Sequence, residues 1–300
     1  MVKVSERFVS VDGIRTHYLE AGEGPPLVLL HSGEFGGSAR LTWEFNLAAL
    51  SAHFRVLAPD WLGYGETDKI RDFVSGSDRM MAHIAAFVRT MALEEADFIG
   101  SSMGGTYLVR ELATSSPRLP VRRAVITSGG GFVPDNEHRR AMLDYDGTAA
   151  AMQRTLQAMF VDPRWWNDQD YIRRRVESSL LPGAFETAAA ARITSPSRPP
   201  RSDFGQPDNT DYESISVPVL VVAGEQDKLR EPGYAEEIAA RIPRGTAVNL
   251  KDAGHMANIE QAERWNRCVL EFLTAAGEPH VAPVNSQTAR ALPPPARSSE

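Results

Sequence analysis

The chain has 300 residues, of which 42% are hydrophobic, and its formal net charge at pH 7 is −7. This length and apolar content are sufficient to bury a large core, which argues against a chain that is disordered throughout. Charges of both signs are spread along the chain, without the basic stripe that is typical of a nucleic-acid-binding protein. The acidic balance also gives no electrostatic attraction to an anionic membrane. We therefore expect no nucleic-acid or membrane partner.

The cysteine content and the apolar runs narrow the class of protein further. The single cysteine, Cys268, cannot form an internal disulfide, and no Cys/His spacing typical of a zinc site is present. The first residues lack the apolar core of a signal peptide, and no apolar run is long enough to span a bilayer. We therefore expect a soluble, cytoplasmic protein without a metal site. A homodimer or a higher homo-oligomer is left open.

Strands and helices are predicted to alternate along most of the chain. A hairpin comes first, with strands at residues 7–11 and 14–19 around the turn dipeptide Asp12-Gly13. Continuous apolar runs, which predict strands that are covered on both faces, lie at 26–30, 54–58, 97–99, 121–126, 217–222 and 247–250. Helical patterns lie between them at 43–50, 80–91, 106–113, 234–241 and 262–273. This order predicts an α/β fold with a mostly parallel central sheet covered by helices.

The alternation is interrupted in the middle of the chain. Residues 132–212 contain no convincing strand, but they carry helical patterns at 141–160 and 171–181, followed by a run of Pro, Ser and Arg at 195–202. We predict a helical lid over the carboxyl ends of the strands, inserted between core segments 1–131 and 213–276. Residues 277–300 are rich in Pro, Ala and Ser and are predicted to form a disordered tail.

A candidate nucleophile lies at the centre of the chain. Residues 100–104 read Gly-Ser-Ser-Met-Gly, which fits the pattern G-x-S-x-G, and they follow a predicted strand and precede a predicted helix. A serine in such a turn needs small neighbours so that strand and helix can approach each other, and glycines at 100, 104 and 105 meet this need. We therefore predict Ser102 as a nucleophile, against the alternative of an ordinary glycine-rich turn.

A serine hydroxyl becomes an effective nucleophile only when a base removes its proton. Of the seven histidines, His255 follows the last predicted strand and precedes a helix, which places it at the edge where Ser102 emerges. Asp227 follows the strand at 217–222 and is predicted to orient the histidine, with Glu225 as a nearby competitor. The loop after the strand at 121–126 carries no acid, so the predicted order is Ser, Asp, His.

Donors for a developing oxyanion complete the predicted site. One is the backbone N–H of Met103, directly after the candidate nucleophile. The other comes from the loop at residues 31–37, in which Gly33 is our candidate. We expect His31 to brace this loop rather than to serve as a second base.

These residues resemble the α/β-hydrolase superfamily over about the first 275 positions. Within it, residues 101–105 and 263–273 are most similar to the meta-cleavage product hydrolases, which split a C–C bond in vinylogous 1,5-diketones made by ring-opening dioxygenases. The resemblance implies a structural role for Asp60. It also implies that Arg175 in the lid grips the substrate's carboxylate and dienol oxygen, although residues 173–175 could instead form a solvated face.

Several positions depart from that family's pattern. Ser101 replaces an Asn before the nucleophile, Met256 replaces a Trp after the histidine, Ser32 and Glu34 interrupt the glycine-rich loop, and Thr42 aligns with an Asn. All of them line the expected site, so the substrate can differ while the triad stays the same. The predicted substrate-binding residues are Arg175, Ser32, Glu34, Thr42, Ser101, Trp165, Trp166 and Met256.

The resemblance implies a serine hydrolase that cleaves a C–C bond in a small-molecule vinylogous diketone acid, with no cofactor. A carboxylesterase or lactonase acting on a small hydrophobic substrate uses the same triad and remains an alternative. A non-catalytic binding protein of the same fold is a second alternative. Ser102 argues against haloalkane dehalogenases and epoxide hydrolases, whose turn usually carries an aspartate.

Overall fold

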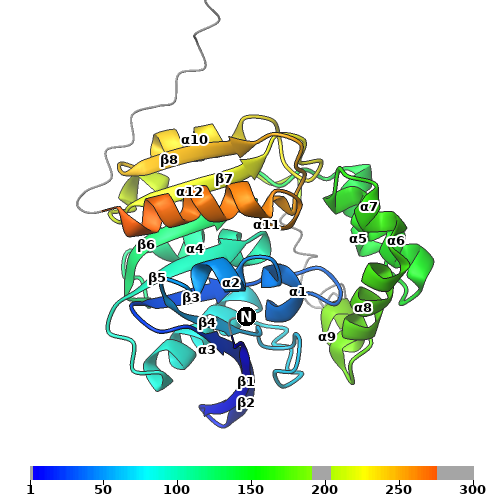
Figure 1. Cartoon of the computed structure of the whole chain (residues 1–300), viewed down its shortest axis with the longest axis horizontal. Coiled ribbons are helices and arrows are strands. Elements are labelled where there is room, and N and C mark those ends of the chain that lie inside the picture. The colour runs from blue at the N-terminus through cyan, green and yellow to red at the C-terminus, as the bar shows by residue number, and fades with distance from the viewer. Residues whose placement is uncertain (1–2, 191–203, 276–300) are drawn as a thin grey trace, which may run out of the picture.

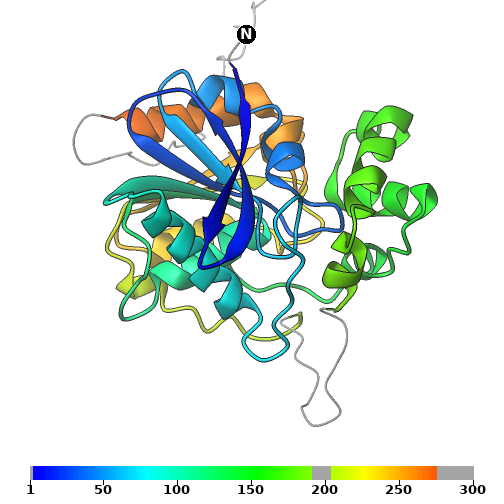
Figure 2. The ribbon, with the colours of Figure 1, turned by 90° about the horizontal axis from the view of Figure 1, so that it is seen from below.

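The apolar runs of the sequence form one central sheet in the computed structural model, which describes residues 3–190 and 204–275. The strands are β1 (Ser5–Val11), β2 (Ile14–Ala21), β3 (Pro26–Leu30), β4 (Arg55–Pro59), β5 (Ala96–Ser101), β6 (Val121–Thr127), β7 (Val219–Gly224) and β8 (Gly245–Leu250). Their order in the sheet is β1-β2-β4-β3-β5-β6-β7-β8. Strand β2 pairs antiparallel with β1 and β4, and all other neighbours are parallel. The predicted mostly parallel sheet is confirmed, and Figure 2 shows the twisted β1–β2 hairpin at one edge.

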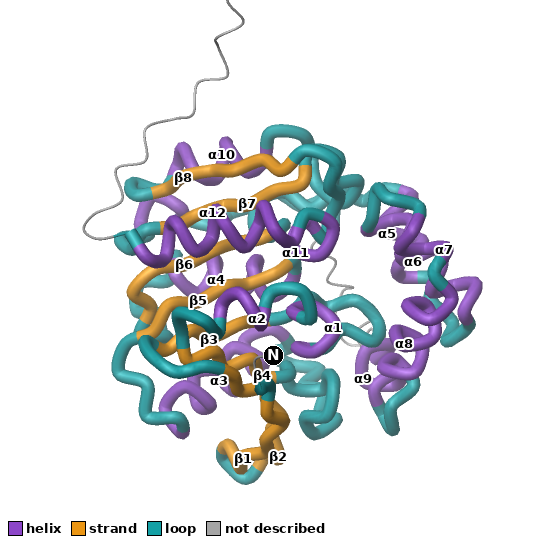
Figure 3. Tube along the Cα trace, viewed as in Figure 1, coloured by secondary structure: helices purple, strands orange, loops and turns teal. Residues whose placement is uncertain are grey.

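Helices cover both faces of this sheet (Figures 1 and 3). The core helices are α1 (Ala39–Trp43), α2 (Leu47–Leu50), α3 (Ser77–Thr90), α4 (Met103–Leu112), α10 (Tyr234–Arg241), α11 (Ala257–Glu260) and α12 (Ala262–Thr274). Helices α3, α4 and α10 bury residues such as Phe87 and Leu108 in one apolar core. Helices α1, α2 and α12 bury Trp43 and Trp265 in a second core on the opposite face. The sheet is thus apolar on both sides, as its unbroken apolar strands predict.

The predicted helix at residues 43–50 is wrong, because the chain turns there between α1 and α2. The side-chain amide of Asn46 donates to the backbone O of Asn258 and to Oδ1 of Asn266, both at 2.9 Å. Its tertiary hydrogen bonds therefore override the helical pattern of the flanking residues.

In the described residues between β6 and β7, the chain forms five further helices. They are α5 (Glu137–Leu143), α6 (Ala149–Met159), α7 (Arg164–Asn167), α8 (Gln169–Ser179) and α9 (Ala184–Ala190), and the short 3₁₀ helix Tyr212–Ser214 precedes β7. The predicted helix at 141–160 is wrong as one element, since Gly147 has a φ of 88° and Thr148 caps the start of α6. Figure 1 places α5–α9 together beyond the carboxyl ends of the parallel strands.

Some predictions stay open. The domain boundaries and the function of the insertion as a lid remain predictions. The Pro/Ser/Arg run at 195–202 and the tail at 277–300 lie outside the described residues. Within the described ranges, no helix is long and apolar enough to cross a membrane.

A buried carboxylate, Asp60, holds the loop after β4 against neighbouring segments. Its Oδ1 accepts the N–H of Ala39 at 2.8 Å, and its Oδ2 accepts Nδ1–H of His17 at 2.7 Å and the N–H of Glu66 at 2.9 Å. Burial by itself would raise the pKa of Asp60, but the hydrogen bond from His17 and the neighbouring groups keep that pKa below its usual value. These contacts agree with the expected structural role of Asp60.

His31 braces the predicted oxyanion loop, residues 31–37, against the loop after β4. The Nε2 of His31 accepts the backbone N–H of Trp61 at 3.0 Å, so Nδ1 carries the proton and donates to the backbone O of Ser32 at 2.6 Å. Burial lowers the pKa of His31, which keeps the ring neutral. The contacts of this histidine agree with the predicted bracing role.

We expect Asp60→Asn to lower the free energy of unfolding by about 2–3 kcal/mol at pH 7, because the amide turns its own N–H groups toward N–H donors. The pKa of Asp60 is lower in the folded chain than its value near 3.8 in the unfolded chain. The carboxylate therefore stabilises the fold fully above pH 3.8, and this stabilisation is lost as the pH falls through the folded pKa. The deficit of the variant should therefore shrink in acid. Urea unfolding across pH checks this, with the exposed Asp211→Asn as a control that stays within about 0.5 kcal/mol of the parent. An unchanged stability of Asp60→Asn at pH 7 would contradict the ionised carboxylate.

Candidate active site

Ser102 lies in a tight turn between β5 and α4 with a φ of 52°, a conformation that costs energy for any residue with a side chain. Three glycines make the turn possible. A Cβ on Gly100 would lie 2.6 Å from Cα of Gly105, and a Cβ on Gly104 would lie 2.8 Å from the backbone O of His31. The predicted strand–turn–helix around Ser102 is confirmed, and it presents the hydroxyl at the carboxyl edge of the sheet.

The structure brings the three predicted triad side chains together. The Oγ of Ser102 lies 2.7 Å from Nε2 of His255, and Nδ1 of His255 lies 2.8 Å from Oδ2 of Asp227. The three residues follow β5, β8 and β7, whose carboxyl ends meet at one edge of the sheet. Glu225, the competing acid, is exposed and donates its backbone N–H to Leu250. The acid in contact with the histidine is therefore Asp227.

The surroundings of Asp227 keep it ionised. Burial alone would raise its pKa, but His255, Arg230 and the backbone N–H of Leu229 lower it below the usual value. The N–H of Leu229 donates to Oδ1 at 2.8 Å, which leaves Oδ2 for the histidine. A carboxylate at this place fixes the proton of His255 on Nδ1, so Nε2 can accept the proton of Ser102.

The two predicted oxyanion donors also lie next to each other. A Cβ on Gly33 would lie 2.9 Å from Cβ of Met103, so only a glycine allows this approach. The N–H of Met103 is in the first turn of α4, where backbone donors have no partner within the helix. The hydroxyl of Tyr64 donates to the backbone O of Gly33 at 3.1 Å and so orients the loop. Their role as oxyanion donors remains a prediction.

Four of the predicted substrate-binding residues are fully buried near this turn. The hydroxyls of Ser32 and Thr42 form a hydrogen bond to each other at 2.9 Å. The hydroxyl of Ser101 has no hydrogen-bond partner in the described part of the chain. Met256 belongs to an apolar cluster between the core and the insertion. Their contact with a substrate remains a prediction.

Trp165 and Trp166 lie on α7 and pack against this same apolar cluster. The ring of Trp165 lies 5.0 Å from that of Tyr171 and 5.4 Å from that of Phe160, measured between centroids. Trp166 instead faces the ammonium of Lys228 at 5.9 Å. The two tryptophans thus pack in the insertion, and their contact with a substrate also remains a prediction.

Arg175 is fully buried, so the alternative of a solvated face is wrong for this residue. Arg173 and Arg174 are the exposed members of the run and pair with acids at the surface. One terminal nitrogen of Arg175, Nη1, donates to Oε1 of Glu34 at 2.6 Å, and Nη2 donates to the hydroxyl of Tyr171 at 2.7 Å. Two predicted binding residues, Arg175 and Glu34, are thus joined to each other.

Two buried charged residues, which no sequence motif indicates, hold the triad loops. Arg230 donates to the backbone O of Ser128 at 3.1 Å and of Gly130 at 2.7 Å, which ties the loop of the acid to the loop after β6. Glu260 accepts the N–H of Gly254 at 2.6 Å and of Val161 at 2.7 Å, which ties the loop of the histidine to the insertion. Most of their partners are backbone groups, which leave no motif in the sequence.

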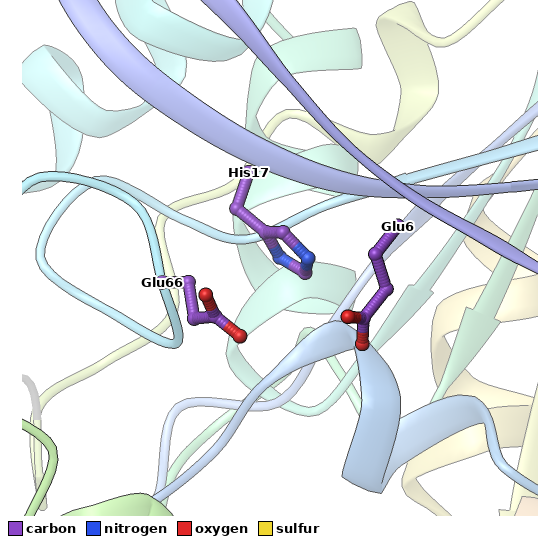
Figure 4. A group of neighbouring side chains, drawn as sticks. All are labelled: Glu6, His17 and Glu66. Atoms are coloured by element: carbon purple, nitrogen blue, oxygen red, sulfur yellow. The ribbon is translucent and has the colours of Figure 1, made fainter.

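One cluster outside the triad has ligand atoms close enough to hold a cation. Possible ligand atoms of Glu6, His17 and Glu66 lie within 4.8 Å of one another (Figure 4). However, Glu6 already pairs with Arg40. Both glutamates are exposed, so no fold element fixes their carboxylates as a metal site requires. We assign no metal to this cluster.

Comparison with known proteins agrees with this geometry. The model of the alpha/beta hydrolase family matches residues 27–267. The 2-hydroxy-6-oxo-6-(2'-aminophenyl)hexa-2,4-dienoic acid hydrolase of Metapseudomonas resinovorans is 29% identical over 273 residues, covering 90% of this chain and 91% of the relative. Carboxylesterase YbfK of Bacillus subtilis is 28% identical, covering 89% of this chain and 86% of the relative.

A solved structure extends the comparison to three dimensions. The meta-cleavage product hydrolase CumD of Pseudomonas fluorescens IP01 superposes with a TM-score of 0.79 at 27% identity, covering 89% of this chain and 97% of that one. The sequence relatives thus include hydrolases named for a hexa-2,4-dienoic acid and for 2-hydroxymuconate semialdehyde, and the structural neighbours include one named as a meta-cleavage product hydrolase. Because the family model covers most of the sequence, the chain belongs to the alpha/beta hydrolase family.

Proposed function

We propose that this chain is a serine hydrolase that cleaves the C–C bond of a vinylogous diketone of the meta-cleavage product type. The hydrogen-bonded series Ser102–His255–Asp227 is the observation that carries the proposal. The relative from Metapseudomonas resinovorans and the neighbour CumD, each aligned over about nine-tenths of this chain, support the choice of reaction.

The geometry supports a two-step mechanism. The Oγ of Ser102 forms a bond to the ketone carbon, its proton passes to Nε2 of His255, and the carbonyl electron pair moves onto the oxygen. This oxygen faces the N–H groups of Gly33 and Met103. The C–C bond then breaks as the carbonyl reforms, and His255 gives its proton to the leaving carbon.

The leaving carbon must be able to hold the electron pair of the broken bond. The dienol of such a substrate therefore first becomes a ketone, which makes that carbon an acceptable carbanion equivalent. Water then repeats the attack on the acyl group at Ser102, with His255 again taking and returning the proton. All of these steps use groups of the chain itself and water.

A carboxylesterase or lactonase is the second candidate, and a specific observation favours it. Arg175, the residue that would grip a substrate carboxylate, is already paired with Glu34. An ester needs no such grip, and its attack and breakdown use the same three side chains. The similarity to carboxylesterase YbfK supports this candidate.

We expect a fluorophosphonate probe to label Ser102, because His255 activates that hydroxyl for attack at phosphorus. Ser102→Ala should abolish labelling, as judged by intact-protein mass spectrometry. The exposed Ser115→Ala is the control and should label like the parent. A parent chain that stays unlabelled would instead support a non-catalytic binding protein.

Asp227→Asn should lower kcat/KM by about 10³–10⁴-fold, because an amide no longer holds the proton of His255 on Nδ1. Glu225→Gln is the matched control, since this exposed carboxylate belongs to the same loop, and it should stay within about twofold of the parent. Steady-state kinetics on any accepted substrate measures both variants. Equal losses in the two would show that Asp227 is not the orienting acid.

We expect the chain to turn over a ring-cleavage dienone, followed by the loss of its visible absorbance, with release of the two carbon fragments. The reason is that the same three side chains that attack the carbonyl carbon of an ester can attack the ketone carbon of the dienone. Parallel assays with p-nitrophenyl esters distinguish the two candidates. Hydrolysis of the esters alone would leave the carboxylesterase or lactonase reading.

A further inference from the structure

A buried ion pair joins the oxyanion loop to the insertion. The side chains of Glu34 and Arg175 are 2% and 0% exposed, and Oε1 of the acid lies 2.6 Å from Nη1 of the arginine. Glu34 belongs to the loop after β3, whereas Arg175 lies on α8, 141 residues later in the chain. The pair is a contact between the core and the insertion.

This pair is linked through neighbouring residues to both sides of the proposed reaction centre. Glu34 directly follows Gly33, the glycine that approaches Met103. The guanidinium of Arg175 lies 6.0 Å from the ring centroid of Phe160. Phe160 follows Met159, whose backbone O accepts the N–H of His255 at 2.8 Å. The ion pair is therefore linked both to the loop of the predicted oxyanion donor and to the segment that holds the base.

Both members of the pair are charged at neutral pH. Burial by itself would raise the pKa of Glu34, but Arg175 and a hydrogen bond from Ser32 hold it below its usual value. Burial would likewise lower the pKa of Arg175, but Tyr171 and Glu34 raise it above its usual value. The pair thus brings no net charge to the site.

A carboxylate that approached Arg175 would meet an arginine that already has a carboxylate. It would either displace Glu34, which leaves a buried charge without a partner, or place two carboxylates on one guanidinium. A neutral oxygen meets neither cost. The Nε of Arg175 is buried and has no hydrogen-bond partner in the described part of the chain, so a donor remains for a carbonyl or hydroxyl oxygen.

We propose that Glu34 is a specificity-determining residue, which makes the site select substrates that present a neutral oxygen, rather than a carboxylate, to Arg175. Within the proposed function, the preferred substrate is then an uncharged vinylogous diketone, such as an ester of a ring-cleavage acid, and for the second candidate an uncharged ester or lactone. This inference rests on the proposed function, in which Ser102 attacks a carbonyl carbon, and it restricts the charge of the compound that is attacked.

The test uses two matched pairs of substrates. The first is a ring-cleavage dienone acid and its methyl ester, which differ in charge but share the reacting ketone. The second is a pair of p-nitrophenyl acyl esters, one ending in a carboxylate and the other in a primary carboxamide. The parent chain should show a kcat/KM at least about tenfold higher for the neutral member of each pair. Glu34→Gln keeps the size and one acceptor of the side chain but removes its charge. In this variant the neutral-to-acid ratio should fall by about tenfold or more, because Arg175 becomes available to the acid.

Glu44→Gln is the matched control. Glu44 forms the neighbouring ion pair between the core and α8, with Arg174 at 2.8 Å, but Arg174 is 42% exposed. Glu44→Gln should therefore show the same ratio of kcat/KM for the neutral and the acidic compound as the parent chain. A purely structural role of Glu34 would lower kcat/KM for both members of a pair equally, and that result would overturn the inference.

A binding measurement covers the case in which Glu34→Gln does not fold. Calorimetric titration of Ser102→Ala with the dienone acid and with its methyl ester should show at least about tenfold weaker binding of the acid. Equal or tighter binding of the acid would overturn the inference. Failure of the parent chain to turn over any of the four compounds, together with no labelling by the fluorophosphonate, would instead remove the proposed function. Turnover without a preference for the neutral compounds would remove only the role of Glu34.

Discussion

The hydrogen bond between Ser102 and His255 depends on one constraint, which is that parallel strands end at the same edge of a sheet. Strands β5, β7 and β8 each deliver one side chain to that edge from positions far apart in the chain. The glycines around Ser102 let α4 start against the sheet, and without them the hydroxyl could not stand at this edge. Loop contacts of Arg230 and Glu260 then hold the acid and the histidine in place.

Charge is arranged differently in the two halves of the site. Around His255, a single ionised carboxylate, Asp227, supports a positive charge that develops during the reaction. Around Arg175, the acid Glu34 is present before any substrate arrives and cancels a fixed positive charge. The first arrangement serves acyl transfer of any kind, whereas the second is the one that we propose to act on substrate choice. Under the proposed role of Glu34, a substitution at that position changes substrate choice while Ser102, His255 and Asp227 stay as they are.

The sequence predicted those features that depend on chain order and missed those that depend on side-chain partners. The sheet and the positions of Ser102 and His255 follow from alternating patterns and from where each strand ends. The pairing of Arg175 with Glu34 could not be predicted, because the two residues lie 141 positions apart and no pattern links them. Asn46 broke a predicted helix for the same reason, since its amide bonds to residues more than 200 positions away.

The insertion is fastened at two places to opposite sides of the reaction centre. Met159, at the end of α6, binds the backbone of His255, and Arg175, on α8, binds the loop that follows Gly33. The spacing between Nε2 of His255 and the predicted oxyanion donors thus depends partly on helices that contribute no reacting atom. A substitution on α6 or α8 that shifts either contact should therefore alter the alignment at Ser102, even though it lies outside the triad.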